Sequence, residues 1–180
     1  EVEADAHGRR LTMVSALLSI LRKQQPSDVE ESIIDAALRV LDRKFTDTVP
    51  VLADLLAVVQ EGPAELREVA VDRSDWDEYQ RITRGLEASL ISLTRGGRLG
   101  ETFARHTTNP MVRDRPVVYD ISGLKETDTD LRAATLLACW SNGFATVNVA
   151  HALAEAGLEP QRHYFVIMDE LWQALRSGAG

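Results

Sequence analysis

The stretch Tyr164–Trp172 reads YFVIMDELW, and it decides which fold the sequence predicts. Five apolar or aromatic residues are followed directly by two carboxylates, Asp169 and Glu170. A short, continuous apolar run is typical of a strand buried in a sheet that is covered on both faces. The two acids then mark the point where such a strand would end.

A second run of the same kind, VVYDISG, begins at Val117 and turns at Gly123. Between the two runs, residues 128–156 form a long and mostly apolar helical pattern, which Gly157 and Pro160 close. Strand, helix and strand in this order predict a βαβ unit with parallel strands. Because two strands cannot make a covered sheet, we expect further strands from outside the chain or from its first half.

Residues 1–96 follow a different pattern, in which one amphipathic helix succeeds another. Apolar residues recur at the helical period, and Ser27 with Glu30 three positions later is typical of a capping box. A further helix is expected from about Thr48 to Gly62, and another after Ser74. Four or five such helices with short connections predict a small all-α bundle whose apolar stripes form its core.

A break rich in Gly, Thr, Arg and Pro occupies residues 97–115. Its sequence GGRLGET is superficially similar to a phosphate-binding loop, but no register supplies the lysine that such a loop requires. We therefore predict a connector here. The expected domains are a helical bundle over 1–96, the connector over 97–115 and the βαβ unit over 116–180.

The chain has 180 residues, of which 44% are hydrophobic, and a net charge of −8. This acidic balance disfavours strong direct binding of nucleic acid, which needs a basic face. Cys139 is the only cysteine, so neither an intrachain disulfide nor a cysteine zinc cluster is expected. No membrane-spanning run or signal peptide is evident, which favours a reducing cytosolic setting. The start without methionine suggests a piece of a longer protein.

Carboxylates follow both predicted strands, Asp120 after the first and the pair Asp169–Glu170 after the second. In parallel α/β sheets, ligands bind beyond the carboxyl ends of the strands, so these acids would face one crevice. Phosphoryl-transfer sites use one carboxylate to hold Mg²⁺ and another group to orient the attacking water. The alternative is simpler, because a buried strand that reaches solvent also becomes polar.

Three stretches, RPVVYDISGL, AATLLACWSNGFA and HYFVIMDELWQALRSG, together resemble the conjugative or type IV secretion traffic ATPases. These belong to the HerA–FtsK branch of P-loop motors, and the likeness is to the actinobacterial type. The helical half resembles the all-helical insertion of that family, so the resemblance covers nearly the whole chain. It implies an α/β fragment of a RecA-like P-loop NTPase core with an inserted helical bundle, mostly helical overall.

The resemblance implies roles for the three acids. Asp169 would belong to the Mg²⁺ shell and hold the ion through a water molecule, while Glu170 would act as catalytic base or orient the attacking water. Asp120 would either support the nucleotide site or only cap the turn at Ser122 and Gly123. ATP and Mg²⁺ would be the cofactors of the parent protein. Its partners would be secretion-channel proteins, further copies of itself in a hexamer, and a DNA or protein substrate, in the cytoplasm at the inner face of the membrane.

Two departures from the family pattern limit what this chain does by itself. No Walker A motif lies in it, and it stops before the strand that carries a polar sensor and before an arginine finger. We therefore expect the chain alone neither to bind ATP tightly nor to hydrolyse it. The alternative from another class is a helical protein-interaction module without catalytic activity, in which the acids are merely solvated. An acid-based hydrolase without a phosphate loop would need further polar residues that the helical half does not supply.

Overall fold

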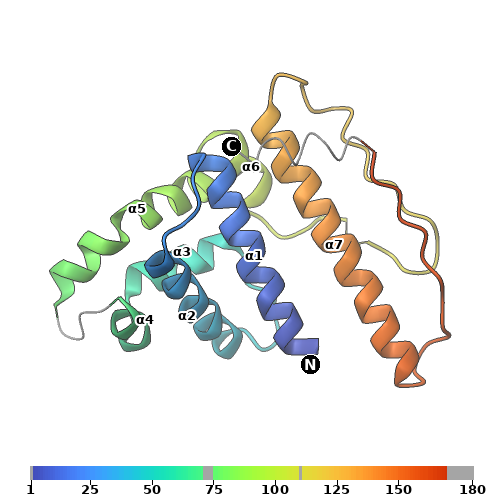
Figure 1. Ribbon diagram of the computed structural model, residues 1–180, viewed down its shortest axis with the longest axis horizontal. Helices are drawn as coiled ribbons and strands as arrows, with labels where there is room; N and C mark the ends of the chain where they lie inside the picture. Colours follow the sequence, from blue (N-terminus) through green and yellow to red (C-terminus); the bar gives the residue numbers. More distant parts are fainter. Residues whose placement is uncertain (1, 71–74, 110, 170–180) are drawn as a thin grey trace. The chain divides into compact units, whose positions relative to one another are not determined.

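The computed structural model describes residues 2–70, 75–109 and 111–169. These residues form seven α-helices and no β-strand (Figure 1). The helices are α1 (Val2–Arg22), α2 (Asp28–Lys44), α3 (Leu52–Glu61), α4 (Ala64–Val69), α5 (Trp76–Arg95), α6 (Gly97–Phe103) and α7 (Thr129–Glu155).

The expected α/β fold is therefore wrong for the described part of the chain. The apolar runs at 117–121 and 164–168 are present, but neither forms a strand. A strand exists only through hydrogen bonds to a neighbouring strand, and two short runs offer too little pairing to form a stable sheet alone. The described residues do not form a RecA-like core.

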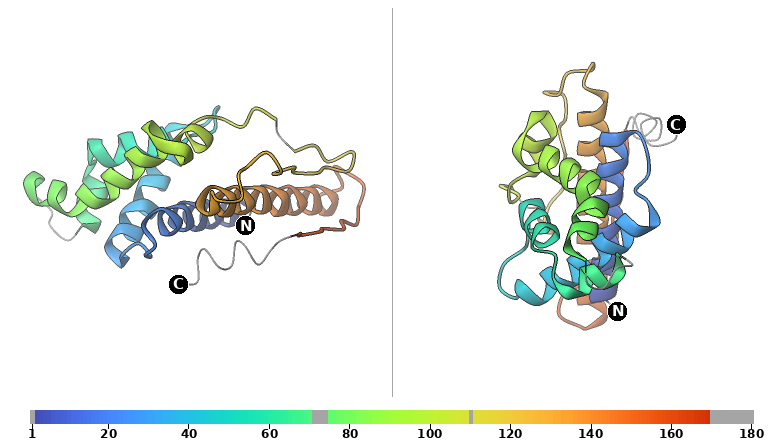
Figure 2. Two further views of the ribbon diagram at one scale, coloured as in Figure 1. Left: turned by 90° about the horizontal axis from the view of Figure 1, so that it is seen from above. Right: turned by 90° about the vertical axis from the view of Figure 1, so that its left-hand side faces the viewer.

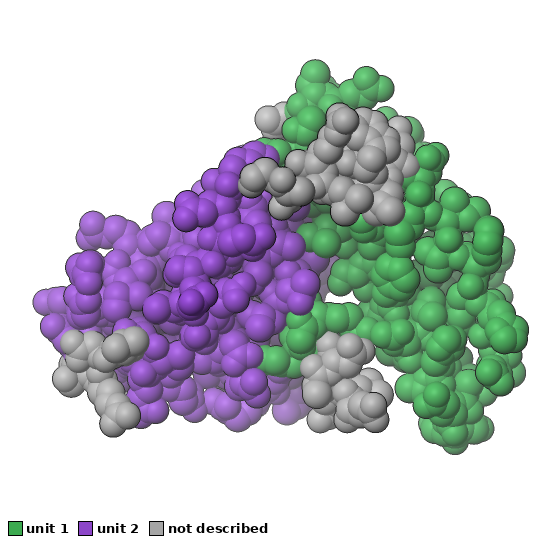
Figure 3. All heavy atoms as spheres, in the orientation of Figure 1, with its two compact units in different colours: residues 1–9, 108–180 green, residues 10–107 purple. Residues whose placement is uncertain are grey.

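The chain divides into two compact units, which Figure 3 shows in different colours. Unit 2 comprises residues 10–107, and unit 1 comprises residues 1–9 together with 108–180. The domains predicted from sequence were 1–96, 97–115 and 116–180. The boundary between residues 107 and 108 falls within the predicted connector, whereas the boundary between residues 9 and 10 falls within the predicted bundle.

Unit 2 is a helical bundle, as the apolar periodicity of the first half predicts. Helix α2 packs against α3 and α4, α3 also packs against α5, and α6 packs on α5. Its largest fully buried side chains come from α1 to α5: Leu18, Ile33, Ile34, Leu41, Leu55, Leu56, Val59, Leu66, Tyr79, Leu86, Leu90 and Leu93. These positions lie on one stripe of each amphipathic helix, which is why the stripes meet to form a core.

Local sequence signals set the ends of the helices in unit 2. Ser27 and Glu30 form the predicted capping box at the start of α2, with each side chain bonded to the backbone of the other residue. Helix α3 ends at Gly62, whose φ of 55° lies in the left-handed region. A Cβ atom at Gly62 would lie 2.7 Å from the rings of Trp76 and Tyr79, so the close approach of α5 also requires glycine.

Within the predicted connector, Gly97–Phe103 forms the short helix α6. A side chain at Gly100 would bring its Cβ within 3.1 Å of the Ser92 carbonyl oxygen on α5. Gly100, one of the glycines that suggested a loop, thus allows one backbone to pack closely against another. The prediction that GGRLGET is no phosphate cradle concerns these same residues, which the structure places in a helix.

Unit 1 is built around α7, which confirms the long helix predicted over residues 128–156. The segments before and after α7 return along it on extended paths, as Figures 1 and 2 show. Arg132 at the start of α7 donates to the Leu124 carbonyl at 3.2 Å, while Glu159 beyond its end pairs with Arg113 at 2.6 Å. The segment from Arg113 to Leu124 therefore runs opposite to α7. None of the helices in the described residues is long and apolar enough to cross a bilayer.

Candidate functional site

The first candidate site consists of the acids that follow the two extended segments of unit 1. Asp169 is exposed at the end of the second segment, and Asp120 is exposed in the first. Both segments run towards the N-terminal end of α7 (Figure 1). Glu170, the predicted catalytic residue, and Trp172 lie outside the described residues.

Aromatic residues hold the two segments against α7. The Tyr119 hydroxyl and the Asn142 Oδ1 atom of α7 form a hydrogen bond of 2.8 Å. The rings of Tyr164 and His151 lie 6.0 Å apart, and Arg162 donates to the Arg113 carbonyl at 2.5 Å. The segments before and after α7 thus run beside this helix without the strand pairing that the predicted βαβ unit requires.

Asp120 has a local structural role. Its Oδ1 atom accepts a hydrogen bond of 2.9 Å from the Ser122 N–H group, and this bond lowers the pKa of the Asp120 carboxyl. The side chain therefore caps the turn at Ser122 and Gly123, which was one of the two roles expected for it. A carboxylate with a lowered pKa also stays charged at neutral pH, so this contact is compatible with the other expected role of Asp120, which is to support a nucleotide site.

Asp169 has the chemistry that a Mg²⁺ shell requires. In nucleotide sites Mg²⁺ keeps several waters and takes only one or two carboxylates in addition to phosphate oxygens. An exposed carboxylate after an apolar segment fits such a shell, and Asp169 would hold the ion there. Across the part of the chain that the structure describes, no three or more His, Cys, Asp or Glu residues gather as an all-protein metal site.

Apolar side chains of the two segments face solvent. Val118 is 87% exposed, Phe165 is 91% exposed and Ile167 is 77% exposed. Val166, between Phe165 and Ile167, is 52% exposed as well, so the exposed positions do not alternate as they would in a strand covered on one face.

Cys139 is the remaining nucleophile of unit 1. It is half-buried on α7, and burial raises the pKa of its thiol. A protonated thiol is a poor nucleophile and a poor metal ligand, which agrees with the inert thiol expected from its apolar neighbours.

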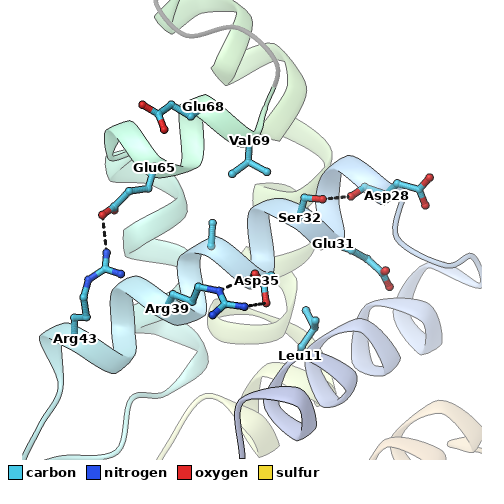
Figure 4. Close-up of a pocket in the computed structure, with 11 residues that line it drawn as sticks. Leu11, Asp28, Glu31, Ser32, Asp35, Arg39, Arg43, Glu65, Glu68 and Val69 are labelled. Carbon is cyan, nitrogen blue, oxygen red and sulfur yellow. Dashed lines mark hydrogen bonds and ion pairs between the residues drawn. The ribbon is translucent and has the colours of Figure 1, made fainter. Parts of the chain in front are cut away.

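The second candidate site is an open groove in unit 2 with a volume of 860 Å³ (Figure 4). We call it the acidic groove, and the residues that line it come from α1, α2 and α4: Leu11, Asp28, Glu31, Ser32, Asp35, Ala36, Arg39, Arg43, Glu65, Glu68 and Val69. Leu11, Ala36 and Val69 supply its apolar walls. Because these residues lie within 10–107, unit 2 forms the groove by itself.

Two ion pairs brace the acidic groove. The Nε atom of Arg39 lies 3.0 Å from an Asp35 carboxylate oxygen one turn earlier on α2. Arg43 of α2 reaches Glu65 of α4 at 2.7 Å, so this pair crosses between two helices. Figure 4 shows both pairs as dashed lines.

This groove was not predicted from the sequence. Asp28, Glu31 and Asp35 recur at three- and four-residue spacing, which indicates one acidic face of a helix. That signal was available, but any solvated helix face gives the same pattern. The contribution of α1 and α4 depends on packing, which the spacing of residues along one helix does not reveal.

Comparison with protein families, with curated proteins and with solved structures finds no significant match to this chain.

Proposed function

We propose that this chain is part of an ATP-hydrolysing motor that powers conjugative or type IV secretion transfer of DNA or protein. In the complete motor, Asp169 contributes to the shell of a Mg²⁺ ion bound with ATP, and Glu170 orients or deprotonates the attacking water. The motor works as a hexamer with secretion-channel proteins, in the cytoplasm at the inner face of the membrane. Bound Mg²⁺ would supply charge neutralisation at the phosphates.

One observation carries the proposal, namely the placement of the acids after two apolar segments. Asp120 and Asp169 follow segments that flank one helix and run towards the same end of it (Figure 1). The chemical roles proposed for Asp169 and Glu170 come from the YFVIMDELW motif and its resemblance to the traffic ATPases. The proposal rests on these residues and does not require a sheet within this chain.

The first test is the coding sequence around this stretch. A Gly-x-x-x-x-Gly-Lys-Ser/Thr motif shortly ahead of Glu1 would supply the phosphate-binding half of an ATP site. A native start codon at Glu1 and a stop codon after Gly180 would refute the proposal, because nothing in these residues provides a phosphate loop.

The second test is ATP turnover by the full-length protein. The Glu170→Gln variant should bind ATP as the wild type does while turnover falls by about a hundredfold or more, since a general base typically contributes that much. Glu126→Gln, which removes an exposed acid of the same unit, is the matched control and should leave turnover unchanged. Wild-type turnover in the Glu170→Gln variant would remove Glu170 from the mechanism.

The 180-residue chain by itself should not bind ATP at micromolar concentration, because backbone N–H groups and the lysine of a phosphate loop supply most of the affinity. Titration of a fluorescent ATP analogue measures this directly. Micromolar binding that Asp169→Ala abolishes would show that the chain holds a complete nucleotide site.

The second candidate function is a helical protein-interaction module, and the acidic groove favours it. The groove belongs to a bundle with its own buried core, and its walls combine apolar side chains with charge. Under this alternative, partner binding would be insensitive to ATP and to substitution of Asp169.

A further inference from the structure

We propose that the acidic groove of unit 2 binds a basic amphipathic helix of a partner protein. The acidic groove carries the carboxylates of five residues, namely Asp28, Glu31, Asp35, Glu65 and Glu68, and only two guanidinium groups. Both guanidinium groups are paired with carboxylates of the groove itself. Five negative and two positive charges leave a net charge of −3, which favours a positively charged occupant.

Helix stability does not account for all of this charge. Asp28 and Glu31 lie in the first turn of α2, where the helix dipole favours acids. Glu68 lies in the last turn of α4, where the dipole disfavours them. An exposed acid in that position costs the helix a little stability, and Glu68 lines the same groove as the acids of α2.

The walls of the groove determine what kind of cation fits. Leu11 of α1, Ala36 of α2 and Val69 of α4 place apolar surface among the acids. A single metal ion or a polyamine would leave this apolar surface exposed, and a nucleic acid has the wrong charge. A helix with leucines on one face and lysines beside them matches both features, since it covers the apolar walls and pairs with Asp28, Glu31 and Glu68.

The test uses the full 180-residue chain and a synthetic probe. The probe is a labelled helical peptide of about 18 residues, long enough to be helical, with leucines at positions i, i+3, i+4 and i+7 and lysines elsewhere. Fluorescence anisotropy should show saturable binding that weakens with added salt, because exposed charges are screened. A peptide with glutamate in place of every lysine should not bind.

Matched variants distinguish binding in the acidic groove from attraction of the peptide by the overall negative charge of the chain. Glu31→Gln combined with Glu68→Gln should weaken binding about tenfold, since each substitution removes one ion pair with the peptide. Glu101→Gln combined with Glu126→Gln changes the net charge equally outside the groove and should have no effect. Leu11→Ser should also weaken binding, and circular dichroism verifies that each variant retains its helices.

Three outcomes would overturn the proposal: no saturable binding, equal weakening by the two double variants, or equal binding of the glutamate peptide. The proposal goes beyond the motor function and does not depend on it. Peptide binding without an ATP site, or an ATP site without peptide binding, would each refute one proposal and leave the other standing.

Discussion

Tyr79 and Tyr164 show how far the surroundings of a hydroxyl group determine its contribution to stability. The Tyr79 hydroxyl of α5 donates a hydrogen bond of 2.7 Å to the Val59 carbonyl, near the end of α3. Carbonyl groups in the last turn of a helix lack intrahelical partners, so this bond supplies one. The Tyr164 hydroxyl is also buried, but it has no hydrogen-bond partner among the described residues.

The two tyrosines should therefore respond differently to replacement by phenylalanine. Tyr79→Phe leaves a buried carbonyl unpaired and should lower the free energy of unfolding by about 1–2 kcal/mol. Tyr164→Phe removes a hydroxyl that gains nothing from its surroundings and should leave stability unchanged or slightly higher. Urea denaturation measures both variants, and an equal loss in both would show that the hydrogen bond of Tyr79 is not the cause.

Tyr79 should also make stability depend on pH in the alkaline range. Burial raises the pKa of Tyr79 to about 12, from an ordinary value of 10.0. Between these values the unfolded chain loses this proton while the folded chain keeps it, so the folded state binds more protons and stability falls as pH rises. The contribution of Tyr79 protonation to the free energy of unfolding is fully present below pH 10. By pH 12 the free energy of unfolding has fallen by about 2–3 kcal/mol through this group.

The measurement compares wild type with Tyr79→Phe, because the other titrating groups are common to both. The stability advantage of the wild type should shrink between pH 10 and 12 in urea denaturation. A difference between the two proteins that stays constant over this interval would mean that Tyr79 titrates normally in the folded state.

At the scale of helices, Arg22 joins three elements of unit 2. Its guanidinium donates from α1 to Ser89 Oγ at 2.7 Å and to the Gly85 carbonyl at 3.0 Å, both on α5. It also pairs with Glu30 of α2 at 2.9 Å. Since Glu30 belongs to the capping box as well, one group positions the ends of α1 and α2 against α5.

Arg22→Lys should lower the free energy of unfolding by about 1–2 kcal/mol, because an ammonium group cannot reproduce the planar fork of bonds to two helices. Arg39→Lys is the matched control, since Arg39 pairs with Asp35 on its own exposed helix face and should matter little. Thermal unfolding followed by circular dichroism compares the two variants. Equal shifts in midpoint would indicate that Arg22 acts only through its charge.

The helices were predictable from the sequence because their signals are local. The apolar period, the capping box at Ser27 and the helix end at Gly62 each depend only on residues a few positions apart in the sequence. The strands were predicted wrongly because the composition of YFVIM favours an extended strand, but a strand forms only where a second strand is available to pair with it. Asp120 could be placed at its turn from its neighbours, whereas the acidic groove depends on the packing of three helices and gave no separate signal.

At the scale of the whole chain, the two units differ in how their apolar residues are used. In unit 2, helices α2, α3 and α5 each contribute several large apolar side chains that are fully buried. In unit 1 Val118 on one segment and Phe165 and Ile167 on the other are exposed. Large exposed apolar side chains favour a covering partner where they form a contiguous patch.

Hydrogen exchange of the 180-residue chain should separate the two units. Among the described residues, the backbone N–H groups of 117–120 and 161–168 make no hydrogen bonds to other backbone groups. Such amides exchange without any opening step, so they should lose protection within the first seconds, whereas the amides of α2, α3 and α5 should be protected. Mass spectrometry of peptides from each segment resolves the two classes.

The matched comparison adds Phe165→Ser with Ile167→Ser, which removes apolar surface and leaves the backbone intact. Exchange in 161–168 should be as fast in this variant as in the wild type, since no pairing is lost. Slow exchange in the wild type that becomes fast in the variant would show that these segments are paired, either in a second copy of the chain or in a sheet. The helical arrangement of unit 1 would then describe only the unpaired chain, and the apolar face would be the surface through which pairing occurs.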